Sequence, residues 1–252
     1  MDIEVSLSGA SNLDPLKDVY REAVSEAPEA QEAIAHRNVA LLVIDVQYLD
    51  AARGHGVFAD AEKSGVPADA QEYYFNRLEN LALPNIRRLQ DAFRGHRLEV
   101  IHTRIMSLTQ NGRDRSPGHK RLGLHAAPGS KDAEFIEQVA PQGDEIVFSK
   151  TASGVFVSTN LEFVLRNMDI HALFMCGVYT NECVETTARD ASDLGFFTSV
   201  IEDACATVTP ELHNSSLNTL RDRYAKILTT EEAIAELEAN AKLQASAKLR
   251  PR

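Results

Sequence analysis

The sequence contains six short, mostly aliphatic segments, and the first of them, VALLVID at 39–45, is nearly unbroken and ends in an acid. Apolar residues at successive positions are typical of a parallel strand that is buried on both faces. Comparable segments follow at 98–103, 171–176, 196–202 and 225–229, with a weaker one at 144–149. Helical patterns lie between them, and strands that alternate with helices form βαβ units. We therefore predict an α/β fold, with three α/β/α layers in a Rossmann-like arrangement and a mainly parallel six-stranded sheet.

The chain of 252 residues is long enough for one α/β domain with an extension at each end. We place this domain at 37–230. Residues 1–36 are predicted to form a helical arm whose pattern is broken at Pro28, and residues 231–252 a helix followed by a basic tail. The start of the chain lacks the apolar segment of a secretory signal, and no stretch is apolar enough to cross a bilayer, which predicts a cytoplasmic protein.

The composition disfavours several classes of partner. A formal net charge of -11 repels nucleic acid and anionic membranes, so we expect neither as a partner. The three cysteines show no CxxC spacing and no pairing with histidine, so neither a disulfide framework nor a structural zinc site is indicated. Reduced thiols in a cytosol fit this pattern best.

Two long segments that contain Gly and Pro follow predicted strands directly, at 50–70 and 106–131. Ligands of open α/β sheets bind beyond the carboxyl ends of the strands. Loops of this length at that edge are candidate pocket walls.

Three residues whose side chains could take part in catalysis lie at or just after the ends of predicted strands, namely Asp45, Lys150 and Cys183. One edge of a parallel sheet would bring them together as an acid, a cation and a thiol. A helix N-terminus and a nearby ammonium lower the pKa of a thiol, and a carboxylate can accept its proton and return it to a leaving amine. From the pattern alone the alternative stays open, because strand-end Asp is common as a helix cap and Cys is often buried.

Four stretches, LLVIDVQ, SKTASGVFVSTNLEFVLRN, GVYTNECVETTARDASDLGF and VIEDACAT, resemble the cysteine-hydrolase branch of the isochorismatase-like hydrolases. The resemblance covers about residues 38–230 and includes enzymes similar to ureidoacrylate and N-carbamoylsarcosine amidohydrolases. It implies a catalytic triad of Asp45, Lys150 and Cys183, in which the thiol attacks an amide or ureide carbonyl. It also implies a non-proline cis peptide between Val178 and Tyr179, with the backbone N–H groups of Tyr179 and Cys183 as the oxyanion hole. By contrast, Cys176 and Cys205 fall in or beside strands, and we expect them to pack in the core.

Two differences between this sequence and other members of the superfamily limit the reactions that we expect. Nicotinamidases carry an Asp-x-His…His metal site after the second strand, and this motif is absent here. His119 and His125 lie in that loop without a clear carboxylate ligand, so we predict no metal and no cofactor. True isochorismatases lack the nucleophilic cysteine, so the presence of Cys183 disfavours hydrolysis of a vinyl ether.

Substrate-binding residues are less constrained by the sequence. Arg104, Arg113, Arg115, Lys120 and Arg121 form a basic cluster on or beside the second long loop, and we take Arg104 and Arg121 as candidates to bind a substrate carboxylate. Solvated loop arginines are the equally weighted alternative.

Four more residues lie near the predicted triad. Gln47 and Asn181 could hydrogen-bond an amide or ureide, although Asn181 could instead cap a helix. Tyr179 and Phe156 could form an apolar wall, and core or interface packing is their alternative role.

The leading hypothesis is a cofactor-free cysteine amidohydrolase acting on a small amide or ureide that carries a carboxylate, and releasing ammonia or carbamate. An isochorismatase-type vinyl ether hydrolase and a non-catalytic scaffold of the same fold are the alternatives. The resemblance favours a homodimer or homotetramer.

Overall fold

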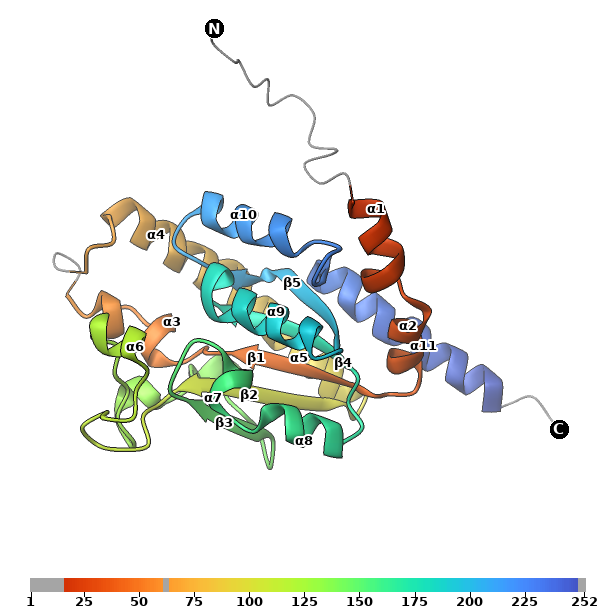
Figure 1. Ribbon diagram of the computed structural model, residues 1–252, viewed down its shortest axis with the longest axis horizontal. Coiled ribbons are helices and arrows are strands. Elements are labelled where there is room, and N and C mark those ends of the chain that lie inside the picture. Colours follow the sequence, from red (N-terminus) through yellow and green to blue (C-terminus); the bar gives the residue numbers. More distant parts are fainter. Residues whose placement is uncertain (1–15, 61–63, 249–252) are drawn as a thin grey trace, which may run out of the picture.

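The computed structural model describes residues 16–60 and 64–248. Its six strands form one parallel sheet in the order β3-β2-β1-β4-β5-β6, as Figure 1 shows for the central strands. The strands are β1 (Val39–Ile44), β2 (Glu99–Ile105), β3 (Ile146–Lys150), β4 (Ala172–Val178), β5 (Phe197–Ala206) and β6 (Lys226–Leu228). The predicted α/β fold with a parallel six-stranded sheet is confirmed.

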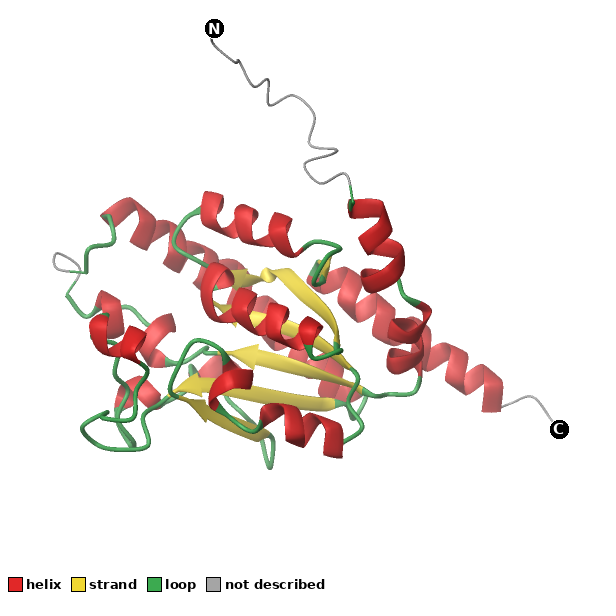
Figure 2. Cartoon of the chain, in the orientation of Figure 1, coloured by secondary structure: helices red, strands yellow, loops and turns green. Residues whose placement is uncertain are grey.

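Helices cover both faces of the sheet, which gives three layers (Figures 1 and 2). One face carries α4 (Ala68–Arg77), the π-helical turn η3 (Leu78–Ala82), α5 (Leu83–Gly95) and α11 (Thr230–Lys248). The opposite face carries α7 (Val155–Ser158), α8 (Leu161–Asn167), α9 (Glu185–Asp193) and α10 (Pro210–Leu220). Every residue of β1 and β4 is buried, because both strands lie at the centre of the sheet between these layers.

Local sequence signals explain where these helices lie. The residues Leu83, Ile86, Leu89 and Phe93 recur at helical spacing, and all four are buried on the face of α5 that meets the sheet. At the start of α11, the backbone N–H of Thr229 donates to Oε2 of Glu232, and the N–H of Glu232 donates back to Oγ1 of Thr229. This reciprocal cap is the Thr/Glu start that the sequence contains.

The described part of the N-terminal arm packs at the amino ends of the strands, beside α11 (Figure 1). It contains α1 (Lys17–Tyr20), the π-helical turn η1 (Arg21–Ser25) and α2 (Pro28–Ala35). The helical pattern breaks at Pro28 as expected, because η1 ends at Ser25, Ala27 is not helical and Pro28 begins the separate helix α2. The first turn of a helix needs no N–H from this position and suits the fixed φ of proline. Residues 1–15 lie outside the described residues.

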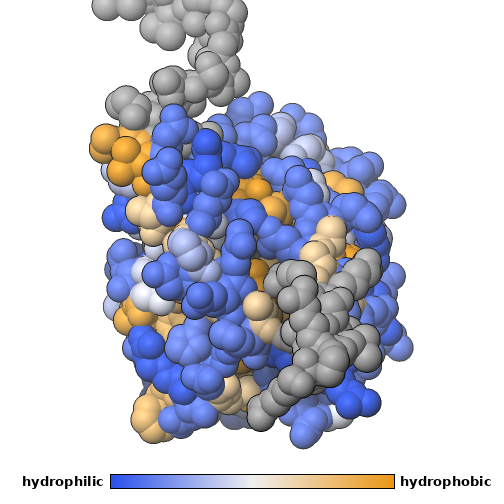
Figure 3. All heavy atoms as spheres, turned by 90° about the vertical axis from the view of Figure 1, so that its right-hand side faces the viewer, coloured by the Kyte–Doolittle hydropathy of each residue, from blue (hydrophilic) through white to orange (hydrophobic). Residues whose placement is uncertain are grey.

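The face that carries α2 and α11 is largely hydrophilic, and its hydrophobic residues appear as small separate patches (Figure 3). Within the part of the chain that the structure describes, no helix has both the length and the apolar character needed to cross a bilayer.

Directly after β1 and β2, the described residues of the segments 45–67 and 106–145 contain only short helical elements. They are α3 (Tyr48–Ala51) and η2 (Gly56–Phe58) in the first, and α6 (Pro117–Arg121), η4 (Lys131–Ala133) and η5 (Glu137–Val139) in the second. Both connections leave the carboxyl edge of the sheet, where the predicted site residues lie.

Candidate active site

Three side chains from separate strands meet at the carboxyl edge of the sheet. Nζ of Lys150, the last residue of β3, lies 2.8 Å from Oδ2 of Asp45, which follows β1. The same Nζ donates a hydrogen bond to Sγ of Cys183 over 3.3 Å. Cys183 lies in the π-helical turn η6 (Thr180–Val184) that follows β4. The fold therefore joins an acid, an ammonium and a thiol that are far apart in the sequence.

The length of the lysine side chain explains how β3 reaches a group on β1. The strand β2 lies between them, and neighbouring strands are ~4.8 Å apart. Lys150 pairs in register with Ile105 of β2, while the backbone N–H of Asp45 donates to the carbonyl oxygen of Thr103. Because an extended lysine can cross the width of one strand, β3 supplies the cation without being next to β1.

Each charged group has further partners that fix its position. Oγ1 of Thr103 donates to Oδ1 of Asp45 over 2.9 Å, and Nζ of Lys150 also donates to the carbonyl oxygen of Ala152 over 2.9 Å. An ammonium has three N–H donors, and Asp45, Cys183 and Ala152 supply three acceptors. Asp45 has a φ of 54°, a conformation that Asp and Asn tolerate better than other side chains do.

The three groups are almost completely buried, with exposed fractions of 1% for Asp45, 0% for Lys150 and 3% for Cys183. Burial lowers the pKa of Lys150, but the nearby Asp45 and Cys183 outweigh this effect, and the pKa is raised above its usual value. Burial raises the pKa of the Cys183 thiol well above its usual value, Lys150 opposes this shift, and Asp45 adds to it. The resting state at neutral pH therefore pairs a protonated thiol with a charged ammonium.

The chain around Cys183 is held by a close backbone contact and a chain of hydrogen bonds. Gly177 has a φ of 124°, and a Cβ atom there would lie 2.1 Å from the carbonyl oxygen of Ile44. The next peptide bond but one along the chain, between Val178 and Tyr179, is cis. Beyond it, Oγ1 of Thr180 lies 2.9 Å from Nδ1 of His213 on α10. Nε2 of His213 in turn lies 2.9 Å from a guanidinium nitrogen of Arg77 on α4.

A cavity of about 290 Å³ opens beside Cys183. The first long loop contributes Asp50, Val57, Phe58, Ser64 and Val66 to its lining, and the second contributes His119, Leu122 and Leu124. Both segments that we expected to form pocket walls therefore line this cavity. The residues around the turn complete it, namely Val178, Tyr179, Asn181, Glu182, Thr207, Val208 and Leu212 together with Ile105 and Ser153.

Two of the predicted substrate-binding residues lie in this cavity. The hydroxyl of Tyr179 donates to the carbonyl oxygen of Asp50 over 3.2 Å, so its ring is fixed across the first loop. Oδ1 of Asn181 accepts a hydrogen bond from Oγ1 of Thr207. Asn181 therefore lines the cavity with its side-chain oxygen bonded to Thr207.

Three other predicted contacts must be corrected. Both amide hydrogens of Gln47 are used, in bonds to the carbonyl oxygens of Ile105 and Asp132, and its Oε1 accepts from the N–H of Ile105. Arg104 points away from the cavity, donates to Ser149 and Ala133, and lies over the ring of Phe135. These two side chains join β2 to its surroundings.

The third correction concerns Phe156. Its ring packs against Phe196 with 5.9 Å between ring centroids, and it does not line the cavity. Phe156 therefore belongs to the packing between α7 and the loop before β5.

The basic cluster serves the structure of the second loop. Arg115 donates to the carbonyl oxygens of Gly112 and Leu124, and Nζ of Lys120 donates to that of Arg113. Arg121 is exposed on α6 and is not among the residues that line the cavity, so its binding of substrate stays a prediction. A short helix turns its basic face to water, and sequence position alone could not reveal this.

The histidines of the second loop have separate surroundings. Nε2 of His125 lies 3.1 Å from Oγ of Ser107, whereas His119 is buried in the cavity wall. Within the described residues, no three His, Cys, Asp or Glu side chains are placed to hold a metal ion together.

Sequence reasoning missed Asp50 and Thr103, and it considered His119 only as a metal ligand. Thr103 ends a predicted strand next to Asp45 in the sheet, which was a usable signal. Asp50 follows Asp45 by five residues on a short helix, and only the folded loop shows that it is buried in the cavity.

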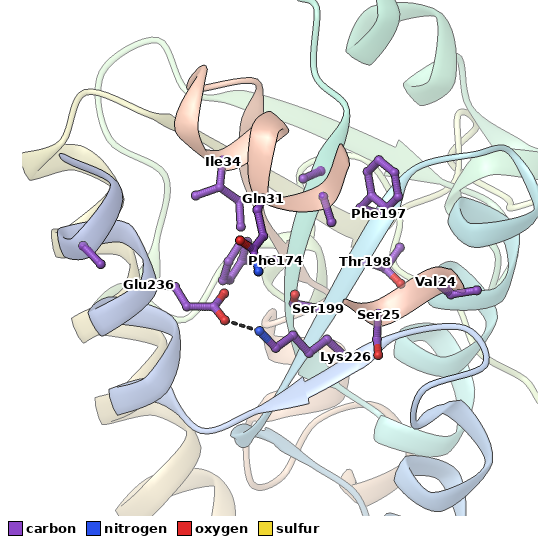
Figure 4. A pocket seen from close by; sticks show the side chains of 13 residues that line it. Val24, Ser25, Gln31, Ile34, Phe174, Phe197, Thr198, Ser199, Lys226 and Glu236 are labelled. Atoms are coloured by element: carbon purple, nitrogen blue, oxygen red, sulfur yellow. Dashed lines mark hydrogen bonds and ion pairs between the residues drawn. The ribbon is translucent and has the colours of Figure 1, made fainter. Parts of the chain in front are cut away.

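A second cavity of about 250 Å³ lies at the opposite end of the sheet, between α2, β5, β6 and α11 (Figure 4). Polar side chains from five elements line it, and Lys226 forms an ion pair with Glu236 across it. It contains no cysteine among its described lining residues and lies at the amino ends of the strands, so the cavity beside Cys183 is the candidate active site.

The family model of the isochorismatase domain matches residues 39–232, which is more than half of the chain. The chain belongs to the isochorismatase family. Its isochorismatase domain spans all six strands and the three residues of the triad site.

Individual relatives agree with this assignment. The isochorismatase family protein YwoC of Bacillus subtilis is 29% identical over 185 residues, which cover 72% of this chain and 93% of YwoC. Ureidoacrylate amidohydrolase RutB of Serratia proteamaculans is 30% identical over 208 residues, which cover 73% of this chain and 77% of RutB. Among solved structures, a cysteine hydrolase from Pseudomonas syringae pv. phaseolicola superposes with a TM-score of 0.65 at 25% identity, over 81% of this chain and 94% of that one.

Proposed function

We propose that this isochorismatase family protein is a cysteine-dependent amidohydrolase that cleaves a C–N bond of a small amide or ureido compound. The observation that carries the proposal is the contact of one buried ammonium, Lys150, with both Asp45 and Cys183 beside a cavity. The similarity to a ureidoacrylate amidohydrolase supports the reaction class.

The proposed reaction begins with a protonated Cys183 thiol. Its proton passes to Asp45 as Sγ attacks the carbonyl carbon, so that an S–C bond forms and the carbonyl oxygen becomes an oxyanion. The backbone N–H groups of Tyr179 and Cys183 hold the oxyanion, and Lys150 stabilises the negative charge that moves between Asp45 and sulfur.

The tetrahedral intermediate then collapses and the C–N bond breaks. Asp45 returns the proton to the leaving nitrogen, which departs as ammonia or as an amine. Water adds to the acyl-sulfur bond, releases the carboxylic or carbamic acid and restores the thiol. Each step balances with water as the only co-substrate, so the proposal needs no cofactor.

The test is ammonia release from a panel of ureidoacrylate, N-carbamoyl amino acids, biuret, nicotinamide and maleamate, with Cys183→Ser beside the wild type. Turnover of one member that falls by at least ~10³-fold in Cys183→Ser, while the melting temperature stays close to that of the wild type, would support the proposal. Turnover that survives this substitution would refute it.

The subunit number and the compartment stay predictions. Sedimentation velocity at two protein concentrations would test the expected homodimer or homotetramer.

A further inference from the structure

Two buried polar atoms in the cavity have no partner. Oδ2 of Asp50 and Nδ1 of His119 lack a hydrogen bond to any described residue, although their residues are only 2% and 3% exposed. An unsatisfied buried polar atom is destabilising, because it has lost its hydrogen bonds to water, so native proteins rarely keep one without a role. Both residues line the cavity that contains Cys183, where a bound molecule could supply the missing partners.

The backbone holds Asp50 firmly in this position. Its carbonyl oxygen accepts one hydrogen bond from the hydroxyl of Tyr74 over 2.7 Å and another from the hydroxyl of Tyr179 over 3.2 Å. The carboxyl group is therefore carried by an anchored turn of α3 rather than by a free surface loop.

His119 is anchored in a comparable way. Its N–H donates to Oγ of Ser116, the N-cap of α6, and the N–H of Ser116 donates to the carbonyl oxygen of Thr151, just after β3. The two polar groups thus enter the cavity from anchored segments of the two long loops.

The charges around the cavity disfavour an anionic ligand. Among the described residues that line it, Asp50 and Glu182 carry carboxyl groups and none is Arg or Lys. The ammonium of Lys150 already has three acceptors, and Arg104 and Arg115 bond to other parts of the chain. A substrate carboxylate would therefore be buried among these lining residues without a cation to pair with it, which is unfavourable.

The protonation states suit a neutral ligand. Burial raises the pKa of Asp50 well above its usual value, and Asp45 raises it further. Burial lowers the pKa of His119, and Lys150 lowers it further. A neutral carboxylic acid and a neutral imidazole each offer one donor and one acceptor. This pattern complements a group that presents both N–H and C=O.

We propose that Asp50 and His119 are specificity-determining residues that bind an uncharged, N–H-rich acyl group, such as a ureide or primary amide without a carboxylate. The inference rests on the proposed amidohydrolase function and replaces the carboxylate-bearing substrate expected from the sequence. The side chains donate to the carbonyl and accept from the nitrogen of the group beside the scissile bond.

The first experiment needs no substrate, because it uses two alkylating reagents that differ in charge. Iodoacetamide is an uncharged primary amide, and iodoacetate is its carboxylate counterpart. The rate at which each modifies Cys183 is measured by mass spectrometry of the cysteine peptide and is divided by its rate with a free small thiol. We expect this normalised rate to be at least ~10-fold higher for iodoacetamide than for iodoacetate.

Variants assign the preference to the two residues. Asp50→Leu and His119→Leu should each reduce the preference by at least ~5-fold, whereas Asp50→Asn, which keeps a donor and an acceptor, should retain most of it. A preference that is unchanged in both leucine variants would overturn the assignment. A normalised rate for iodoacetate equal to or above that for iodoacetamide would overturn the inference as a whole.

The second experiment compares matched substrates by ammonia release, namely N-carbamoylglycine with N-carbamoylglycinamide and maleamate with maleamide. The uncharged member of each pair should have the higher kcat/KM. Preference for the carboxylate members, with loss of turnover in Cys183→Ser, would refute this inference and leave the amidohydrolase function standing. If no member is hydrolysed and neither reagent selects Cys183 over the other cysteines, the proposed function fails, and this inference fails with it.

Discussion

Lys150 and Asp45 form an ion pair of 2.8 Å across an intervening strand, and neither side chain is more than 1% exposed. Taking two charges out of water costs several kcal/mol for each, and their attraction offsets this cost only while both are present. The pair is thus a vulnerable point in the fold as well as the centre of the proposed chemistry.

Lys150→Met should destabilise the protein by about 3–5 kcal/mol, because Asp45 is left as a buried charge without a partner. The double variant Lys150→Met/Asp45→Asn should recover a large part of this loss, since Asn tolerates the left-handed backbone at position 45. Urea denaturation measures both stabilities. Amide turnover should be lost in both variants, and recovery of turnover together with stability in the double variant would contradict the proposed role of the pair.

Gly177→Ala should destabilise the protein by more than ~4 kcal/mol or prevent folding. A Cβ atom at this position would lie 2.1 Å from the carbonyl oxygen of Ile44, and that oxygen belongs to the strand before Asp45. Gly95→Ala is the matched control, because a Cβ atom there meets nothing within 4 Å at the end of α5 and should stabilise the helix by ~0.5–1 kcal/mol. Thermal melting should show a lower melting temperature for Gly177→Ala and a slightly higher one for Gly95→Ala. A folded Gly177→Ala with wild-type stability would contradict this prediction.

The free energy of unfolding should decrease as the pH falls, because His213 is buried. Burial lowers its pKa to about 4, and the nearby Arg77 contributes, whereas an unfolded chain has a histidine pKa of ~6.5. Between these two values the unfolded state binds more protons than the folded state, so stability is lost as the pH falls from ~6.5 to ~4. The contribution of this residue to the free energy of unfolding is fully present above pH ~6.5, and its loss amounts to about 3 kcal/mol.

The variant His213→Gln should remove this part of the pH dependence. Denaturation in urea at several pH values between 4 and 7 gives the change in the free energy of unfolding with pH. The control is His36→Gln, at an exposed histidine of the arm, in which this pH dependence should stay unchanged. Equal slopes in the wild type and in His213→Gln would show that His213 is not the titrating group.

Arg121→Ala should leave kcat/KM within about twofold of the wild-type value, because the side chain is exposed and lies outside the cavity. Asn181→Ala should lower kcat/KM by at least ~10-fold, since it removes a polar group that lines the cavity. The assay uses whichever amide the wild type hydrolyses. A large loss of kcat/KM in Arg121→Ala would support the role in substrate binding that the sequence suggested for this arginine.

The sequence by itself determined the sheet and the position of the triad residues. Aliphatic runs such as 39–45 are typical of inner parallel strands, which pair their backbone on both sides and bury both faces, and the carboxyl ends of parallel strands share one edge of the sheet. The location of Asp45, Lys150 and Cys183 follows from that periodicity. The long loops could be recognised as pocket walls for the same reason.

Only the tertiary structure decided which loop side chains enter the cavity. A loop has no fixed period, so nothing in the sequence separates Arg104, which turns to the far face of β2, from Asp50, which is buried beside Cys183. Gln47 and Asn181 have similar amide groups, but the amide nitrogen of Gln47 donates both its hydrogens to backbone carbonyls, whereas Asn181 lines the cavity. Side-chain direction depends on contacts between residues distant in the sequence, and those contacts exist only once the chain is folded.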